Sequence, residues 1–202
     1  MKFGKILISC ALLLSFATAA EAQDFQFGLK GGFAASWLQG TVVTGYEQVV
    51  PHNSFYAGAF TTCDFASDFF VQAELLYAGR GHSDRSELLP NYSRSLGYLM
   101  VPVFAGYQLI DNLSLMLGPE FGYLLFSKTK AGDKVTDTIS DCRRFNICVA
   151  MQMNYMIFDS FGVDVKFDWG LNKTFKPGMY AEGVNDNGRN MAVQIGVCYK
   201  FD

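Results

Sequence analysis

The segment FGVDVKFDWGL, residues 161–171, indicates the fold most clearly, because apolar residues alternate along it with small or polar ones. The segments FNICVAMQMNYMI, residues 145–157, and MAVQIGVCYKF, residues 191–201, have the same period of two. A helix cannot keep such an alternation on one face, because its period is 3.6 residues. These three segments are therefore predicted to be β-strands.

The same alternation, with more noise, extends upstream and brings the expected number of strands to eight. Two of these strands contain Pro102 and Pro119. Proline cannot donate a hydrogen bond to a strand ladder, so a bulge is expected at each. The upstream strands are expected at residues 25–33, 69–77, 99–109 and 115–125, with a weaker one at 55–65 whose phase the sequence leaves open.

The connections between the expected strands alternate in length. Short turns are expected at residues 66–68, 111–112 and 159–160. An up-and-down barrel with tight turns at one end and long loops at the other has this spacing. The fold class is therefore predicted to be all-β: an eight-stranded antiparallel up-and-down transmembrane β-barrel. The long loops are expected at residues 38–54, 81–94, 128–142 and 173–188, and Arg80 is grouped with the loop charges.

The composition of the less apolar strand face indicates whether that face lines the lumen or covers the outside of the barrel. It is rich in glycine, alanine, serine and cysteine and mixes both signs of charge, which suits a narrow lumen whose outer wall meets lipid. Aromatic residues recur near the strand ends, as in an interfacial girdle. A soluble periplasmic barrel with an apolar ligand cavity is the alternative. The predicted interior charge network comprises Lys30, Glu74, Glu120, Arg144, Asp164, Lys166, Asp168 and Lys200.

The N-terminal residues 1–22 have the layout of a cleaved signal peptide, and residues 23–202 are expected to form the barrel domain. Lys2 and Lys5 precede an apolar stretch at residues 6–16, and Ala20-Glu21-Ala22 is a small-x-small cleavage site. The rival lipoprotein box ending at Cys10 is disfavoured because the apolar run continues past it. Secretion through the inner membrane and residence in the outer membrane of a Gram-negative cell are expected.

The overall composition excludes two broad classes of protein. With 50% hydrophobic and 17% charged residues, the chain is too apolar for a disordered protein. A formal net charge of -3 offers no basic surplus for nucleic acid. The expected partners are outer-membrane lipid and the barrel-assembly machinery during insertion.

No catalytic, cofactor-binding or metal-binding residues are predicted. Asp164 and Asp168 would lie about 13 Å apart on one strand, too far for a glycosidase pair. His52 and His82 are expected in loops, and His82-Ser83-Asp84 holds the residue types of a hydrolase triad in an unsuitable adjacent arrangement.

The cysteines show no zinc or CxxC spacing. Cys148 and Cys198 are expected to be small interior residues without a disulfide. The redox states of all four cysteines, Cys63, Cys142, Cys148 and Cys198, stay open.

Several short motifs follow one another along the chain: FGLKGG at 27–32, AELLY at 73–77, YLMVP at 98–102, LGPEFGYL at 117–124, WGLN at 169–172 and GVCYKF at 196–201. Together they resemble the PorT-like outer-membrane β-barrel proteins of Gram-negative bacteria. The resemblance implies a fold and a location, and it includes the two strand prolines. The namesake takes part in protein secretion, whereas most members have no assigned role. The expected function is therefore a non-enzymatic structural or interaction role, with a secretion accessory as an alternative.

Overall fold

In the computed structural model, antiparallel strands form nearly the whole of the described chain. The structure describes residues 25–39, 49–65, 67–86, 89–176 and 188–201, so the predicted signal peptide lies outside the described residues. The strands are β1 (Phe25–Gln39), β2 (Val49–Asp64), β3 (Phe69–Ser86), β4 (Leu89–Ile110), β5 (Leu113–Ala131), β6 (Lys134–Asp137), β7 (Phe145–Met156), β8 (Phe161–Lys173) and β9 (Arg189–Lys200).

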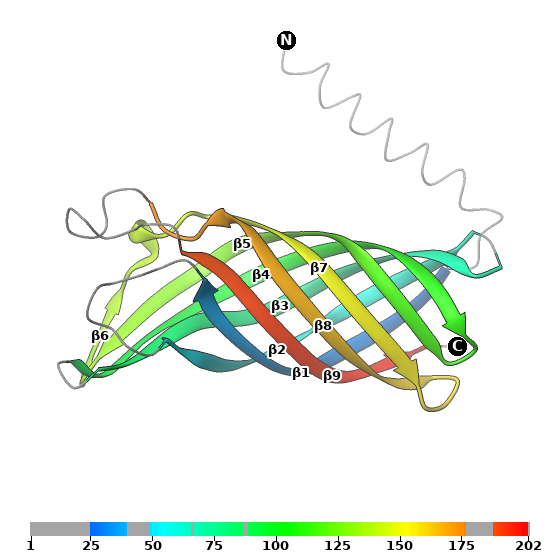
Figure 1. Ribbon diagram of the computed structural model, residues 1–202, viewed down its shortest axis with the longest axis horizontal. Coiled ribbons are helices and arrows are strands. Elements are labelled where there is room, and N and C mark those ends of the chain that lie inside the picture. Colours follow the sequence, from blue (N-terminus) through cyan, green and yellow to red (C-terminus); the bar gives the residue numbers. More distant parts are fainter. Residues whose placement is uncertain (1–24, 40–48, 66, 87–88, 177–187, 202) are drawn as a thin grey trace, which may run out of the picture.

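Eight of these strands close into a barrel. Each pairs with its neighbours in the chain, and β9 pairs with β1 to complete the ring. The short strand β6 stands outside the ring and pairs with β5 in a hairpin. All pairings are antiparallel, so the predicted up-and-down eight-stranded barrel is confirmed (Figure 1).

The apolar face of the strands points outward. Leu75, Leu117 and Ile195 expose 54%, 56% and 56% of their surface, respectively. The intervening residues, such as Glu74 and Gln194, are buried in the lumen. A soluble ligand-binding barrel would need the opposite arrangement, with apolar residues inside. The outward apolar wall is that of a barrel surrounded by lipid, so the soluble alternative is wrong.

The two ends of the barrel differ. Short connections after β2, β4 and β7 lie at the end that also holds the C-terminus, and we call it the turn end (Figure 1). The hairpin β5–β6 lies at the opposite end, the loop end. Strands β3, β4 and β5 contain 18, 22 and 19 residues, whereas β7, β8 and β9 contain 12, 13 and 12. One wall of the barrel therefore rises further than the other at the loop end.

Two predicted loops are replaced largely by strand. Residues 81–94 belong mostly to β3 and β4, and 128–142 hold the end of β5, strand β6 and a short 3-10 helix (Ile139–Asp141). Beyond the lipid-facing band of β3 and β4, residues on the outer face no longer need apolar side chains. Gly79, Gly81 and Ser95 are found at such positions. The alternation is lost there although the strand pairing continues. The other two predicted loops contain segments, 40–48 and 177–187, outside the described residues.

The expected bulges at the two strand prolines are absent. Pro102 pairs with Glu120, and Pro119 pairs with Val149, without a shift in register at either position. Shifts occur instead between Gly97 and Tyr98 and between Pro51 and Tyr56. The prolines are therefore accommodated within regular pairing.

Large interior rings cover glycines on neighbouring strands. The Phe70 ring of β3 lies where a side chain at Gly106 of β4 would be, and the two residues are direct cross-strand partners. The Phe60 ring of β2 covers Gly28 of β1 in the same way. These pairs fill a narrow lumen by combining large and small residues. Within the described ranges no helix is long and apolar enough to span a bilayer.

Candidate functional site

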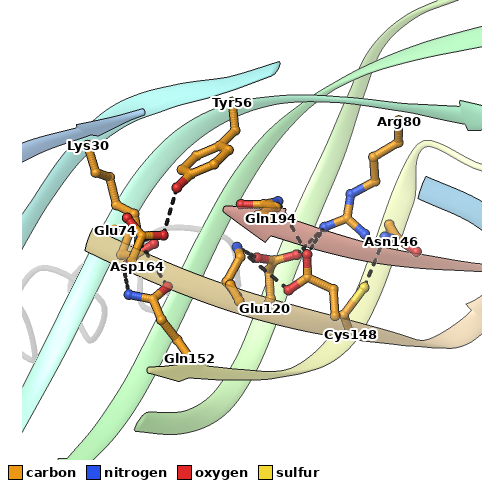
Figure 2. A network of polar contacts seen from close by, with 12 residues as sticks. Lys30, Tyr56, Glu74, Arg80, Glu120, Asn146, Cys148, Gln152, Asp164 and Gln194 are labelled. Atoms are coloured by element: carbon orange, nitrogen blue, oxygen red, sulfur yellow. Dashed lines mark hydrogen bonds and ion pairs between the residues drawn. The ribbon is translucent and has the colours of Figure 1, made fainter. Parts of the chain in front are cut away.

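The middle of the lumen holds two groups of buried charged side chains (Figure 2). Both lie on the inward face of the strands, where every second residue points toward the barrel axis. We call them the turn-side cluster, built around Lys30, and the loop-side cluster, built around Arg80.

The turn-side cluster places one ammonium group between two carboxylates. Lys30 Nζ lies 3.1 Å from Glu74 Oε1 and 3.5 Å from Asp164 Oδ2. It also donates a hydrogen bond of 2.9 Å to Oε1 of Gln152. The Tyr56 hydroxyl donates to Asp164 Oδ2 at 2.6 Å, which offsets the surplus of negative charge. This cluster contains side chains from five strands: β1, β2, β3, β7 and β8.

The loop-side cluster pairs two cations with two carboxylates. Arg80 Nη2 lies 2.6 Å from Glu120 Oε1 and 2.7 Å from Asp168 Oδ2. Lys166 Nζ donates to Glu120 Oε2 and lies 3.6 Å from Asp168 Oδ1. Gln194 adds a hydrogen bond of 3.3 Å to Asp168. Strands β3, β5, β8 and β9 are therefore joined across the lumen.

These groups are removed from water. The side chains of Arg80, Glu120, Lys166 and Asp168 are each 0% exposed. Burying such charges is costly unless each has a partner of opposite sign, and here the two signs balance. The cluster therefore blocks the lumen and ties opposite walls of the barrel together.

A further layer lies above the loop-side cluster, at the loop end. Arg94 donates from Nε to Thr129 Oγ1 at 2.9 Å and lies 3.7 Å from Asp141. Its guanidinium carbon is 4.9 Å from the centre of the Phe175 ring, which is itself 1% exposed. Cys142 forms a β-bridge with Phe175. Residues 174–176, which directly follow β8, thus pack against this layer.

The structure brings together six of the eight residues predicted for the interior network. Arg144 is a correction: it is exposed just before β7 begins, and its side chain donates to the backbone carbonyl of Leu124. The alternation that assigned it inward holds only within the strand. Lys200 is half-buried at the turn end and lines a cavity rather than joining either cluster. The six are Lys30, Glu74, Glu120, Asp164, Lys166 and Asp168.

The largest omission from the sequence prediction is Arg80. The sequence pattern places it with the loop charges, yet β3 continues past it and its side chain is the centre of the loop-side cluster. The sequence does contain a signal for this position: Arg80 and Glu74 are an even number of residues apart on one strand, so both point to the same face. The sequence does not predict Tyr56, because it does not show which residues of that strand point inward. It does not predict Gln152 and Gln194 either, because the network is predicted from charged residues and these two are neutral.

The residues considered for catalysis do not form a relay. His82 is buried and its ring meets the Phe175 ring edge-on at 6.0 Å, whereas Ser83 is half-buried on the other face of β3. Adjacent strand residues point to opposite faces, so these two cannot act together. Both histidines lie in strands rather than loops.

Among the described cysteines there is no disulfide, and Cys142, Cys148 and Cys198 are buried. Cys142 donates weakly to Ser127 Oγ at 3.5 Å and lies in the loop-end layer, outside the strands. Burial raises the pKa of its thiol.

The arrangement of an apolar outer wall and a charged lumen agrees with the match to a protein family. Residues 21–176 match the family described as the outer membrane protein beta-barrel domain. The chain belongs to this family. Its place is accordingly the outer membrane, as predicted.

Two solved outer-membrane barrels have a similar fold. Ail, the attachment invasion locus protein of Yersinia pestis, is 15% identical with a TM-score of 0.52, over 88% of this chain and 99% of that one. Neisserial surface protein A is 12% identical with a TM-score of 0.58, over 87% and 97%. Similarity at this level of identity shows the fold alone. No curated protein matches the chain.

Proposed function

We propose that this member of the outer membrane protein beta-barrel domain family has a structural or interaction role and is not an enzyme. The observation that carries the proposal is the blocked lumen, in which the Arg80, Glu120, Lys166 and Asp168 side chains are fully buried. A lumen filled by paired charges offers no path for solute. The barrel then acts as an anchor for the surfaces at its ends.

The burial of the interior carboxylates argues against catalysis inside the barrel. A general acid or base must come within hydrogen-bond reach of a substrate atom. Glu120 and Asp168 are instead enclosed by Arg80 and Lys166, with no exposed surface. A structural role explains both the pairing and the burial.

The loop end is the surface we propose for recognition outside the cell. Outer-membrane barrels have short turns on the periplasmic side and longer segments outside, which places the turn end in the periplasm. The tall wall formed by β3, β4 and β5 would then project from the membrane, with the exposed strand β6 beside it. Binding residues are commonly held on such projecting segments by a rigid scaffold.

A role as an accessory of protein secretion is the second candidate, and the resemblance to PorT-like proteins favours it. It shares the same barrel and differs in the partner. Retention of secreted cargo in a deletion strain would distinguish it from a purely structural role.

The test is a deletion strain complemented with the whole chain or with a variant in which residues 132–137 are replaced by a two-residue turn. We expect the variant to reach the outer membrane and to fail in restoring any surface-binding phenotype. Mass spectrometry of the membrane lipids serves as the control for catalysis. A lipid modification that disappears on deletion and returns with the whole chain would contradict the non-enzymatic proposal.

A further inference from the structure

A cavity of about 350 Å³ lies at the turn end of the barrel, next to the turn-side cluster. Its lining combines strand residues with the short connections, including Asp64 at the end of β2, Asp111 between β4 and β5, and Asp159 between β7 and β8. Phe60 and Phe70 contribute apolar wall. The cavity is therefore separate from the loop end and from the buried ion pairs.

The charge of this lining is negative. Among the described lining residues, Asp64, Asp111 and Asp159 are exposed carboxylates and Lys200 is the single cation. No ion pair within the described part of the chain neutralises any of the three carboxylates. Because they come from three separate segments, they surround the opening instead of lying on one side of it. A cleft lined by one sign of charge concentrates ligands of the opposite sign.

The cavity wall also carries hydrogen-bonding groups that the protein leaves unused, one on buried Ser114 and one on half-exposed Gln108. Ser114 is 8% exposed and lines the cavity, yet its hydroxyl makes no hydrogen bond with a described residue. Gln108 donates from Nε2 to the carbonyls of Ile110 and Asp111, both at 2.9 Å, which turns Oε1 into an acceptor for another group. Thr62 and Gln72, in contrast, are bonded to each other. Buried polar groups usually have partners, yet Gln26 Oε1, which also lines the cavity, is buried without one among the described residues, so the wall offers acceptors to a bound cationic ligand.

We propose that this turn-end cavity binds a small linear polyamine. Primary ammonium groups would pair with Asp64, Asp111 and Asp159, and one would donate to the Ser114 hydroxyl or to Gln108 Oε1. Carboxylates on three segments favour a ligand with several separated ammonium groups over a monoamine. The site goes beyond the proposed function, because it does not depend on what the loop end recognises.

The test is calorimetric titration of the full barrel, refolded in a zwitterionic detergent, with spermidine. We expect saturable binding of one molecule per barrel. The double variant Asp111→Asn/Asp159→Asn should weaken binding roughly tenfold, because it removes two of the three exposed carboxylates that pair with the ligand. Ser114→Ala should weaken it roughly two- to tenfold.

The matched control is Asp133→Asn, which removes an exposed carboxylate in the β5–β6 hairpin at the opposite end. Its binding should equal that of the wild type. Absence of saturable binding would overturn the proposal. A loss of affinity with Asp133→Asn equal to that of the double variant would also overturn it. So would an unchanged affinity with Ser114→Ala together with equally strong binding of Mg²⁺. Either result would indicate that spermidine is attracted by net charge alone. Gel mobility without boiling verifies that each variant is folded.

Discussion

Arg80 is the residue on which the interior depends most, because one guanidinium nitrogen contacts both Glu120 and Asp168. Arg80→Met leaves these carboxylates buried with Lys166 alone. Breaking a buried pair by removing one partner costs about 3–5 kcal/mol. We expect a loss of this size in the free energy of unfolding, measured by urea titration with tryptophan fluorescence in micelles.

The matched control is Arg189→Met, since Arg189 is exposed at the start of β9. It should change stability by less than about 0.5 kcal/mol. The double variant Arg80→Met/Asp168→Asn restores the charge balance and should recover part of the loss. A double variant less stable than Arg80→Met would show that the charges are not coupled as the structure places them.

Cys142 allows a pH-dependent prediction at the loop end. The thiolate is the reactive form, and burial raises the pKa of this thiol. Reaction of the folded protein with a maleimide should therefore be slow at pH 7 and accelerate as the pH rises toward the raised pKa. Peptide mass spectrometry locates the label. Labelling of Cys142 as fast in the folded protein as in urea would contradict the burial of this residue.

The sequence predicts which residues of the site point inward, but only where the period is clear. Lys30, Glu74 and Lys166 follow from alternation along their strands. Arg144 does not, because the alternation was extended past the strand end. The contacts between strands, such as Tyr56 with Asp164 across 108 positions of sequence, depend on barrel closure and have no local signal.

For the individual strands, the sequence predicts which segments form strands and the order in which they pair, but not how long each strand is. Alternation marks only the lipid-facing part of a strand, since lipid requires apolar side chains there. Strands β3 and β4 continue beyond it with glycine and serine on the outer face. Hydrogen bonding between neighbouring backbones holds these extensions, and backbone pairing leaves no period in the sequence.

Neighbouring strands β3 and β4 pack together by placing the large Phe70 ring over Gly106. Gly106→Val would place a side chain in the space of the Phe70 ring, which belongs to its direct partner. Overpacking of this kind costs about 1–3 kcal/mol. We expect a lower urea midpoint for Gly106→Val, and partial recovery in Gly106→Val/Phe70→Ala. If the double variant is no more stable than the single one, the clash is not with Phe70.

Within the described part of the chain, eight strands form a closed cylinder with an apolar wall, and none of the eight has an unpaired edge in the ring. Such barrels resist detergent until heated, because unfolding must break every strand pair together. The unboiled protein extracted from outer membranes should therefore migrate differently on a gel from the boiled one. Identical migration would contradict a closed barrel in the membrane.

Electrical conductance measures whether the buried ion pairs seal the lumen. Purified wild-type protein, inserted in a planar lipid bilayer, should show no stable channel steps, because the turn-side and loop-side clusters fill the lumen. Long-lived conductance steps from the wild type would show that ions pass the buried ion pairs and that the lumen is open.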